Sequence, residues 1–151
     1  MTYIHVYAPL DGTVIDLAEV PDEVFALKMA GDGVAINPSG QVAVAPIDGQ
    51  LVKLFKGGHA FGIAANDGVE LIVHLGLDTI ELEGKGFAKV AAEGQMVQAG
   101  DHIVFFDRST IEAAGKVILS PVVSSGAGTI VQRASGVVQA GRDILFTLKL
   151  P

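Results

Sequence analysis

Short apolar runs separated by glycines and prolines constrain the fold of this chain more than any other feature. The 19 glycines and six prolines are spread along the 151 residues and do not collect into a linker. Runs of this length between turn residues are typical of strands in a β-sandwich or barrel. We expect strands at residues 13–17, 41–45, 51–55, 60–65, 69–75, 102–106, 116–119, 129–132 and 143–150.

Helix signals are few. The segment Pro21-Asp22-Glu23 places a proline and two acids where one or two helical turns could begin. Residues 109–114 have a helix-like start and stop at Gly115. Both helices would be short, so they do not change the all-β prediction.

Two segments recur along the chain. Residues 8–14 (APLDGTV) resemble residues 45–51 (APIDGQL), and residues 97–103 (VQAGDHI) resemble residues 138–144 (VQAGRDI). Each reads as a strand, a turn and a second strand. We therefore predict that residues 1–151 form a single all-β domain, an antiparallel β-sandwich or barrel-like fold with an internal pseudo-repeat and a few short helices.

Composition excludes several classes of protein. Mean hydropathy is +0.48, yet the richest apolar run, residues 69–77, is broken by Glu70, His74 and Gly76. A spanning helix needs roughly 18 consecutive apolar residues, so we expect no direct membrane insertion. The net charge of −7 disfavours nucleic acid as a partner, because affinity for phosphates comes from Lys and Arg. The chain has no cysteine and begins without a secretion signal, which predicts a cytoplasmic protein.

Two histidines stand out as candidate functional residues. Asn66-Asp67-Gly68 is a strong turn signal between His59 and His74, so the segment reads as a β-hairpin. If Asn66 and Asp67 are a two-residue loop, His59 and His74 lie directly opposite each other on one face. A three-residue loop that includes Gly68 would shift the register and break this pairing.

The residues alone leave three interpretations of this pair open. The two histidines could be core residues whose nitrogens meet backbone groups. They could carry a phosphoryl group, because an imidazole nitrogen can attack phosphorus and later release it. Such a site needs apolar walls against water, for which the available residues are Phe55, Phe61, Ile72 and Leu75. Zinc is the third possibility, but it requires at least one more ligand.

Residues 68–80 (GVELIVHLGLDTI) resemble the active-site motif of the glucose-class IIA components of the bacterial sugar phosphotransferase system. The likeness continues over nearly the whole chain, through VPDEVF at residues 20–25, GDGVAI at 31–36, APIDG at 45–49, HAF at 59–61, GKGF at 84–87, EG at 93–94 and SPVV at 120–123. The resemblance implies one IIA phosphocarrier domain with an antiparallel β-sandwich fold.

What the resemblance implies about function is specific. The phosphoryl group would come from the phosphohistidine of HPr and pass to a cysteine of the IIB domain of a sugar permease. His74 matches the phosphorylated residue, reacting through Nε2, and His59 matches the histidine that steadies the phosphoryl group. Asp78 and Thr79 lie in the matching active-site loop. The matching apolar docking face would comprise Val24, Phe25, Phe55, Phe61 and Ile72. No cofactor would be required, although His59 and His74 could hold zinc in a complex with a partner.

Two departures from the family pattern are visible. Many members have a threonine two residues before the second histidine, hydrogen-bonded to it, whereas this chain has Gly57 there. Some free-standing members also have an amphipathic N-terminal tail. This chain starts almost at its first expected strand, which suggests a short soluble form or a domain excised from a larger fusion.

Two other functions compete with phosphoryl transfer. A zinc hydrolase on a related β fold would need a further His-x-His pair, and no two histidines here are separated by one residue. A regulatory module on the same fold would bind partners without transferring phosphate. The presence of both His59 and His74 argues against that module, and Gly57 leaves it open.

Overall fold

The computed structural model describes residues 2–151. Its strands are β1 Tyr3–Tyr7, β2 Gly12–Asp16, β3 Asp32–Pro38, β4 Val42–Val44, β5 Gly49–Leu54, β6 Ala60–Ala64, β7 Glu70–His74, β8 Phe87–Lys89, β9 Met96–Val97, β10 His102–Phe106, β11 Ser120–Ser124, β12 Thr129–Arg133, β13 Val137–Val138 and β14 Ile144–Lys149. The helices are α1 Glu23–Ala26 and α2 Arg108–Ala113, with 3₁₀ turns η1 Leu17–Glu19 and η2 Thr79–Leu82. Among these described residues, no helix is long and apolar enough to cross a bilayer.

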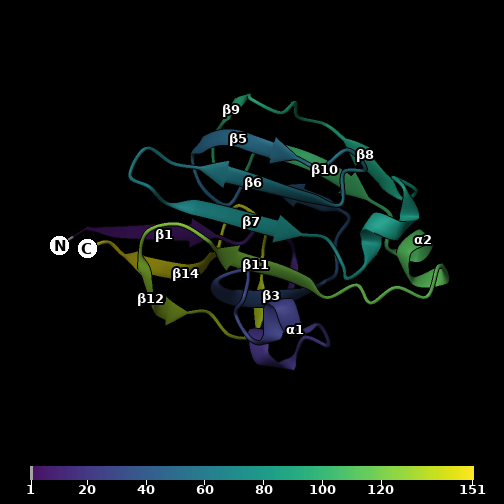
Figure 1. Cartoon of the computed structure of the whole chain (residues 1–151), viewed down its shortest axis with the longest axis horizontal. Helices are drawn as coiled ribbons and strands as arrows, with labels where there is room; N and C mark the ends of the chain where they lie inside the picture. Colours follow the sequence, from purple (N-terminus) through teal and green to yellow (C-terminus); the bar gives the residue numbers. More distant parts are fainter. Residues whose placement is uncertain (1) are drawn as a thin grey trace.

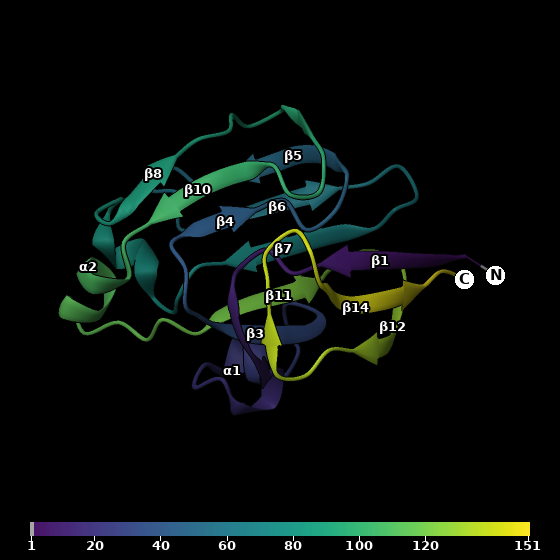
Figure 2. The same cartoon turned by 180° about the vertical axis from the view of Figure 1, so that it is seen from behind.

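The strands form three antiparallel sheets. The large sheet has the order β13-β2-β3-β11-β7-β6-β5-β9, and two small sheets have the orders β1-β14-β12 and β4-β10-β8. Both small sheets lie behind the large one in Figure 1 and in front of it in Figure 2. The main apolar core lies between them and takes side chains from all three sheets, including Val6 of β1, Ile103 of β10 and Val73 of β7. The predicted all-β sandwich with short helices is confirmed.

The local predictions hold for most strands and fail for one. The segment 116–119 is not a strand, and β11 begins only at Ser120, where Ser120 pairs with Ile36 of β3. Val117 is instead exposed, and its carbonyl accepts a hydrogen bond from the Leu77 amide. Strands β1, β3, β8 and β11 were not expected from apolar runs. Both short helices lie where the sequence places them.

The two faces of the large sheet have different roles. On β3, Val34 and Ile36 face the main core, whereas Ala35 between them faces the opposite side. A second, smaller apolar cluster covers that outer side and includes residues of η1 and α1. Its members are Leu17, Val20, Phe25, Ala35, Leu77 and Val123. Because successive strand residues alternate in direction, β7 likewise buries Val73 in the main core and directs His74 to the outer face.

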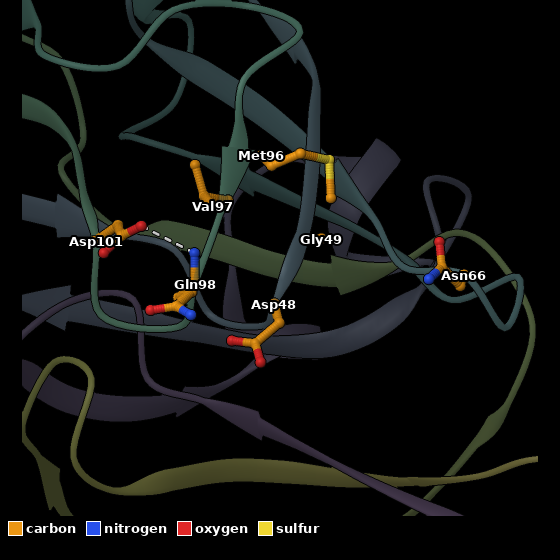
Figure 3. Close-up of a pocket in the computed structure, with 7 residues that line it drawn as sticks. All are labelled: Asp48, Gly49, Asn66, Met96, Val97, Gln98 and Asp101. Atoms are coloured by element: carbon orange, nitrogen blue, oxygen red, sulfur yellow. Dashed lines mark hydrogen bonds between the residues drawn. The ribbon is translucent and has the colours of Figure 1, made fainter.

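The internal repeat is confirmed by matching hydrogen bonds. The Ala99 amide donates to Asp48 Oδ1 at 2.7 Å, and the Ala140 amide donates to Asp11 Oδ1 at 2.7 Å. The turn that carries Ala99 is closed by Asp101, whose carboxylate accepts from the Gln98 amide (Figure 3). Asp48 and Asp101 also line a pocket at this turn (Figure 3). The carboxylates of Asp48 and Asp101 accept hydrogen bonds from backbone amides and so stabilise turns. Neither of the two histidines predicted to be functional lines this pocket.

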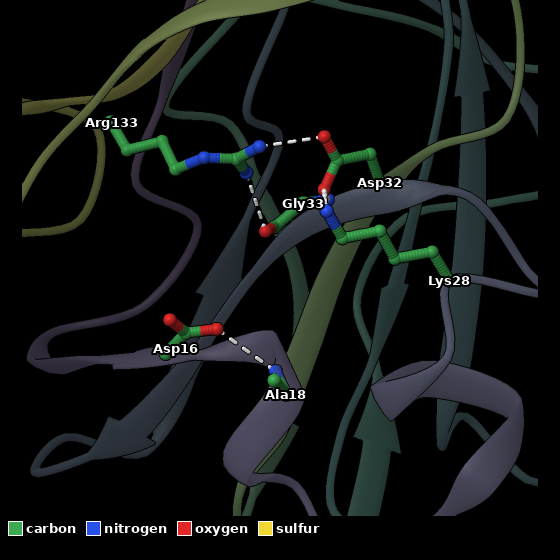
Figure 4. A network of polar contacts seen from close by, with 6 residues as sticks. All are labelled: Asp16, Ala18, Lys28, Asp32, Gly33 and Arg133. Atoms are coloured by element: carbon green, nitrogen blue, oxygen red, sulfur yellow. Dashed lines mark hydrogen bonds and ion pairs between the residues drawn. The ribbon is translucent and has the colours of Figure 1, made fainter.

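Two salt bridges that share Asp32 attach the segment after α1 to the rest of the domain. Asp32 contacts Arg133 Nη2 at 2.6 Å and Lys28 Nζ at 3.4 Å (Figure 4). Partial burial alone would raise the pKa of Asp32, but the hydrogen bond and charge of Arg133 outweigh it and hold that pKa below 3.8. Arg133 also donates to the Gly33 carbonyl at 2.8 Å. Lys28 therefore makes a structural contact.

Candidate active site

The hairpin that carries the candidate site has a three-residue loop. Ala60 pairs with His74 and Ala64 pairs with Glu70, and the Ala65 amide closes the loop by donating to the Val69 carbonyl. Gly68 adopts φ +86°, the left-handed conformation that such loops require at their last position. The prediction that His59 and His74 are directly paired is therefore wrong, and the register is shifted by one residue.

The two imidazole rings nevertheless meet. Their centroids are 5.4 Å apart with an interplanar angle of 69°. His59 lies just before β6, after Gly58 in a left-handed conformation, and its carbonyl accepts from the Leu75 amide. Outside the regular ladder, strand alternation no longer dictates the direction of its side chain. The ring can therefore reach the face that carries His74.

A hydrogen bond assigns the protonation state of the His74 ring. Nδ1 of His74 lies 2.6 Å from the Gly76 carbonyl oxygen. A carbonyl only accepts, so Nδ1 carries the proton, and in the neutral ring the lone pair is on Nε2. The Phe25 ring packs against the same imidazole, with centroids 5.4 Å apart. The His74 ring is thus held with its free lone pair on Nε2.

Burial keeps both rings uncharged at neutral pH. Burial lowers the pKa of His74 below 6.5, although the Gly76 carbonyl and the carboxylates of Asp22 and Asp78 act in the opposite direction. Burial also lowers the pKa of His59, and the neighbouring His74 lowers it further. A neutral imidazole still offers one N–H donor and one lone pair. The pair can therefore supply a nucleophile and a hydrogen-bond donor at the same time.

A hollow of about 670 Å³ opens beside His59. Phe55 and Ile80 form apolar parts of its wall, and the Phe55 ring lies 5.2 Å from that of His59. Lys53, Lys56 and Glu83 also line it, so two cations and one carboxylate lie at this hollow in a chain of net charge −7. The hollow therefore combines apolar walls with cations that attract phosphate oxygens.

Asp78 and Thr79 have separate roles in the structure. Asp78 is exposed, adopts φ +57°, and its carboxylate acts on the His74 ring. Thr79 is fully buried, and its hydroxyl donates to the Leu75 carbonyl at 2.7 Å. That hydroxyl is not available to a bound phosphoryl group. Thr79 therefore shapes the loop after β7, contrary to the expectation that it acts in the site.

The predicted docking residues fall into two groups. Val24 on α1 is 48 % exposed, Phe55 and Ile72 are partly exposed, and Phe25 lies against His74 with little exposure. Phe61 is fully buried in the main core, so its prediction as a docking residue is wrong. The shift in register is the reason, because Phe61 pairs with Val73 and both point inward, away from His74.

Sequence reasoning did not single out several groups that the structure brings to the site. The Gly76 carbonyl holds the His74 ring through its hydrogen bond with Nδ1, and the carboxylate of Asp22 acts to raise the pKa of that ring. Lys53 and Lys56 line the hollow. Asp22 was visible only as part of a helix start, where its side chain accepts from the Val24 amide. The lysines lie in no motif that would have indicated them.

Gly57 leaves the His59 ring without a local hydrogen-bond partner. A Cβ at position 57 would lie 3.4 Å from Nδ1 of His59, so a side chain there would contact the ring. Among residues 2–151, no group makes a hydrogen bond with a ring nitrogen of His59. Packing against Phe55 and His74 therefore orients His59 in this chain.

The described residues do not form a complete metal site. Within residues 2–151, no three histidine, cysteine, aspartate or glutamate side chains are grouped to hold a metal ion. Two imidazoles alone provide fewer protein ligands than zinc takes in structural or catalytic sites.

Comparisons with known proteins agree on one family. The family model described as "phosphoenolpyruvate-dependent sugar phosphotransferase system, EIIA 1" matches residues 4–130. The chain is 43 % identical over 148 residues to the glucose-specific EIIA component of Haemophilus influenzae, covering 97 % of this chain and 89 % of the relative. It is 43 % identical over 145 residues to the N-acetylglucosamine-specific EIICBA component of Klebsiella pneumoniae, covering 94 % of this chain and 22 % of the relative. The solved structure of glucose permease IIA from Mycoplasma capricolum has a TM-score of 0.93 at 41 % identity, covering 99 % of this chain and 97 % of that one.

Proposed function

This chain belongs to the EIIA 1 family of the phosphoenolpyruvate-dependent sugar phosphotransferase system, and we propose that His74 is the residue on which it carries the phosphoryl group. The chain is a phosphoryl-transfer component of that sugar transport system. The observation that carries the assignment is the 2.6 Å hydrogen bond from Nδ1 of His74 to the Gly76 carbonyl, which leaves Nε2 as the nucleophile.

Acceptance begins with attack of the Nε2 lone pair on phosphorus. The bond from Nε2 to phosphorus forms while the bond from phosphorus to the donor breaks, and the proton stays on Nδ1, hydrogen-bonded to the Gly76 carbonyl. The imidazole gains positive charge as the new bond forms. The carboxylates of Asp22 and Asp78, which act to raise the pKa of His74, favour that charge.

His59 stabilises the transferred group. Its N–H donates to a phosphoryl oxygen, and Lys53 and Lys56 attract the remaining negative charge. Phe25 and Phe55 pack beside the two imidazoles and limit the access of water to the phosphohistidine. The same site therefore accepts the group, protects it and donates it.

The partners in this proposal are two other components of the same system. HPr supplies the phosphoryl group from its own phosphohistidine, and a cysteine of a IIB domain receives it. The Klebsiella pneumoniae relative joins components named C, B and A in one protein, which supports a sugar permease as the acceptor. Relatives named for glucose and for N-acetylglucosamine share this component, because the membrane partner binds the sugar. We place the transfer in the cytoplasm, with no nucleic acid involved.

No cofactor takes part in the proposed transfer. His59 and His74 could bind zinc together only if a partner protein supplied a further ligand. Zinc would then occupy the Nε2 lone pair of His74 and compete with the phosphoryl group.

The proposal is tested by reconstituting the first half-reaction. The chain is incubated with phosphoenolpyruvate, enzyme I and HPr, and its intact mass is measured. We expect the addition of one phosphoryl group, which depends on HPr. No increase in mass would favour the regulatory module that binds partners without transfer.

Val24 offers a test of the docking surface. We expect Val24→Asp to lower kcat/KM for phospho-HPr about tenfold, because an exposed apolar side chain is lost next to Phe25, which packs against His74. Val131→Asp is the matched control, since Val131 is 51 % exposed and lies on β12 in a small sheet near the chain termini (Figure 1). Added salt should slow the reaction less than Val24→Asp does. Equal kinetics for the two variants would place the docking surface elsewhere.

The lowered pKa of both histidines predicts a specific dependence on pH. The ¹³Cε1 signals of His59 and His74 should titrate below pH 6.5 in the folded chain and near 6.5 in the urea-unfolded chain. At pH values between the lowered pKa of the folded chain and 6.5, the two histidines therefore bind more protons in the unfolded chain than in the folded one. The resulting stability is fully present above pH 6.5 and is lost as the pH falls through the folded pKa.

The loss of stability should appear as a decrease in the urea concentration at the unfolding midpoint when the pH is lowered from about 7.5 to about 5.5. Removing both imidazoles with His59→Gln and His74→Gln should flatten the decrease. A titration of the folded His74 at or above 6.5 would contradict the prediction.

A further inference from the structure

Ser120, the first residue of β11, is bound to the loop that follows His74. Its side chain is 1 % exposed, and its hydroxyl accepts a hydrogen bond from the Gly76 amide at 3.1 Å. The same hydroxyl donates to the Ile118 carbonyl at 2.9 Å. One buried oxygen therefore connects two chain segments that are 44 residues apart.

A second anchor from the neighbouring segment fixes the next peptide group. The Leu77 amide donates to the Val117 carbonyl at 2.9 Å. The N–H and C=O of a trans peptide point in opposite directions, so this bond aims the Gly76 carbonyl away from Val117. That carbonyl is the one that accepts from Nδ1 of His74.

The backbone conformation and close packing at position 76 require glycine. Gly76 has φ +75°, and a Cβ there would lie 2.8 Å from Thr79 Cγ2 and 3.0 Å from the Val117 carbonyl oxygen. Ser120 holds the peptide before Gly76, and Val117 holds the peptide after it. Gly76 is thus restrained on both sides by hydrogen bonds of its two flanking peptide groups.

We propose that Ser120 is a positioning residue for phosphoryl transfer, which acts by aligning Gly76 so that its carbonyl keeps the proton on Nδ1 of His74. The inference rests on the proposed role of His74 as nucleophile. Ser120 does not touch the reacting atoms. It acts through Gly76, and its hydroxyl is the only side-chain group among the described residues that bonds to the Gly76 backbone apart from His74 itself.

The alignment matters because imidazole has two neutral tautomers. A proton on Nε2 would block the lone pair that attacks phosphorus, whereas a proton on Nδ1 leaves that lone pair free. Some partners do not touch the reacting atoms but fix the tautomer and orientation of a functional histidine. Loss of such a partner typically lowers activity about tenfold or more. Loss of the Ser120 hydroxyl would leave the Gly76 amide buried without its acceptor and the loop free to reorient.

The test compares Ser120→Ala with Ser124→Ala. Ser124 lies on the same strand, and its buried hydroxyl has no hydrogen-bond partner among the described residues, so it is a matched control. We expect Ser120→Ala to lower kcat for acceptance about tenfold with KM for HPr unchanged, since the docking surface is intact. The imidazole ¹⁵N shifts of His74 should show more proton on Nε2 in this variant. The amide hydrogen of Gly76 should exchange faster.

Each outcome decides the proposal. A folded Ser120→Ala with wild-type ¹⁵N shifts and rate would overturn it, as would equal losses in the two alanine variants. If Ser120→Ala does not fold, Ser120→Thr retains the hydroxyl and should keep the wild-type tautomer. A Gly76 amide that exchanges as fast as an exposed loop in the wild-type chain would also refute the proposal. A wild-type chain that accepts no phosphate, with the tautomer still dependent on Ser120, would instead refute the role of His74.

Discussion

Replacing His74 with glutamine is expected to abolish phosphorylation of the chain. Glutamine has no nitrogen lone pair that attacks phosphorus. Among the described residues, His74 is the one histidine whose Nδ1 is bonded to a carbonyl, since Nδ1 of His5 is bonded to the Thr147 hydroxyl. His59 sits beside His74 but has no comparable partner for its ring. We expect no detectable increase in mass after incubation with phosphoenolpyruvate, enzyme I and HPr.

The variant should fold normally, because His74 is only partly buried and faces the outer side of the sheet. His102→Gln is the control, since His102 is exposed on β10 and its ring packs against Phe105, outside the site. It should accept phosphate at the wild-type rate. The wild-type adduct should be labile in acid and survive base, as an N-phosphate does. Persistent labelling of His74→Gln would refute the assignment.

Replacing His59 with glutamine is expected to separate the two half-reactions. His74 keeps its nucleophilic Nε2 in this variant, so acceptance from HPr should continue. Donation should slow by about a hundredfold, which corresponds to about 3 kcal/mol, because the loose transition state then lacks a positioned donor for its spreading charge. The phosphorylated chain should therefore accumulate.

Rapid quench of each half-reaction measures the effect. Acceptance is followed from phospho-HPr, and donation is followed from the isolated phosphorylated chain to a IIB domain. His102→Gln again serves as the control for loss of an imidazole outside the site. Equal slowing of both steps would assign His59 a general structural role. No slowing of either would make it a core histidine without a part in transfer.

Local sequence patterns were sufficient for the elements that carry the site. The apolar run before His74 and the turn residues at 66–68 indicated the hairpin of β6 and β7 without any tertiary information. The recurrence of APLDGTV as APIDGQL likewise identified a repeat that the matched bonds of Asp11 and Asp48 confirm. The hairpin and the repeat can both be recognised from short stretches of sequence, without knowing which distant residues meet in the fold.

The register of the hairpin was beyond local reasoning. Asn66-Asp67-Gly68 is compatible with a two-residue or a three-residue loop, and one residue of difference reverses the face of every side chain on the strand. The three-residue loop turns Phe61 into the core and away from partners. The expected contact of His59 with His74 survived only because His59 lies outside the strand, where alternation no longer applies.

The sequence by itself therefore determined the all-β architecture, the hairpin and the choice of His74 and His59, because strand periodicity, turn chemistry and a family motif are local properties. Only the tertiary structure decided how the His74 ring is held. The Gly76 carbonyl fixes its tautomer, and that carbonyl is aligned by Ser120 and Val117 from a segment some forty residues further along the chain. Such contacts depend on how β7 and β11 pair in the folded sheet, and no periodicity or spacing in the sequence encodes which distant residues that pairing brings together.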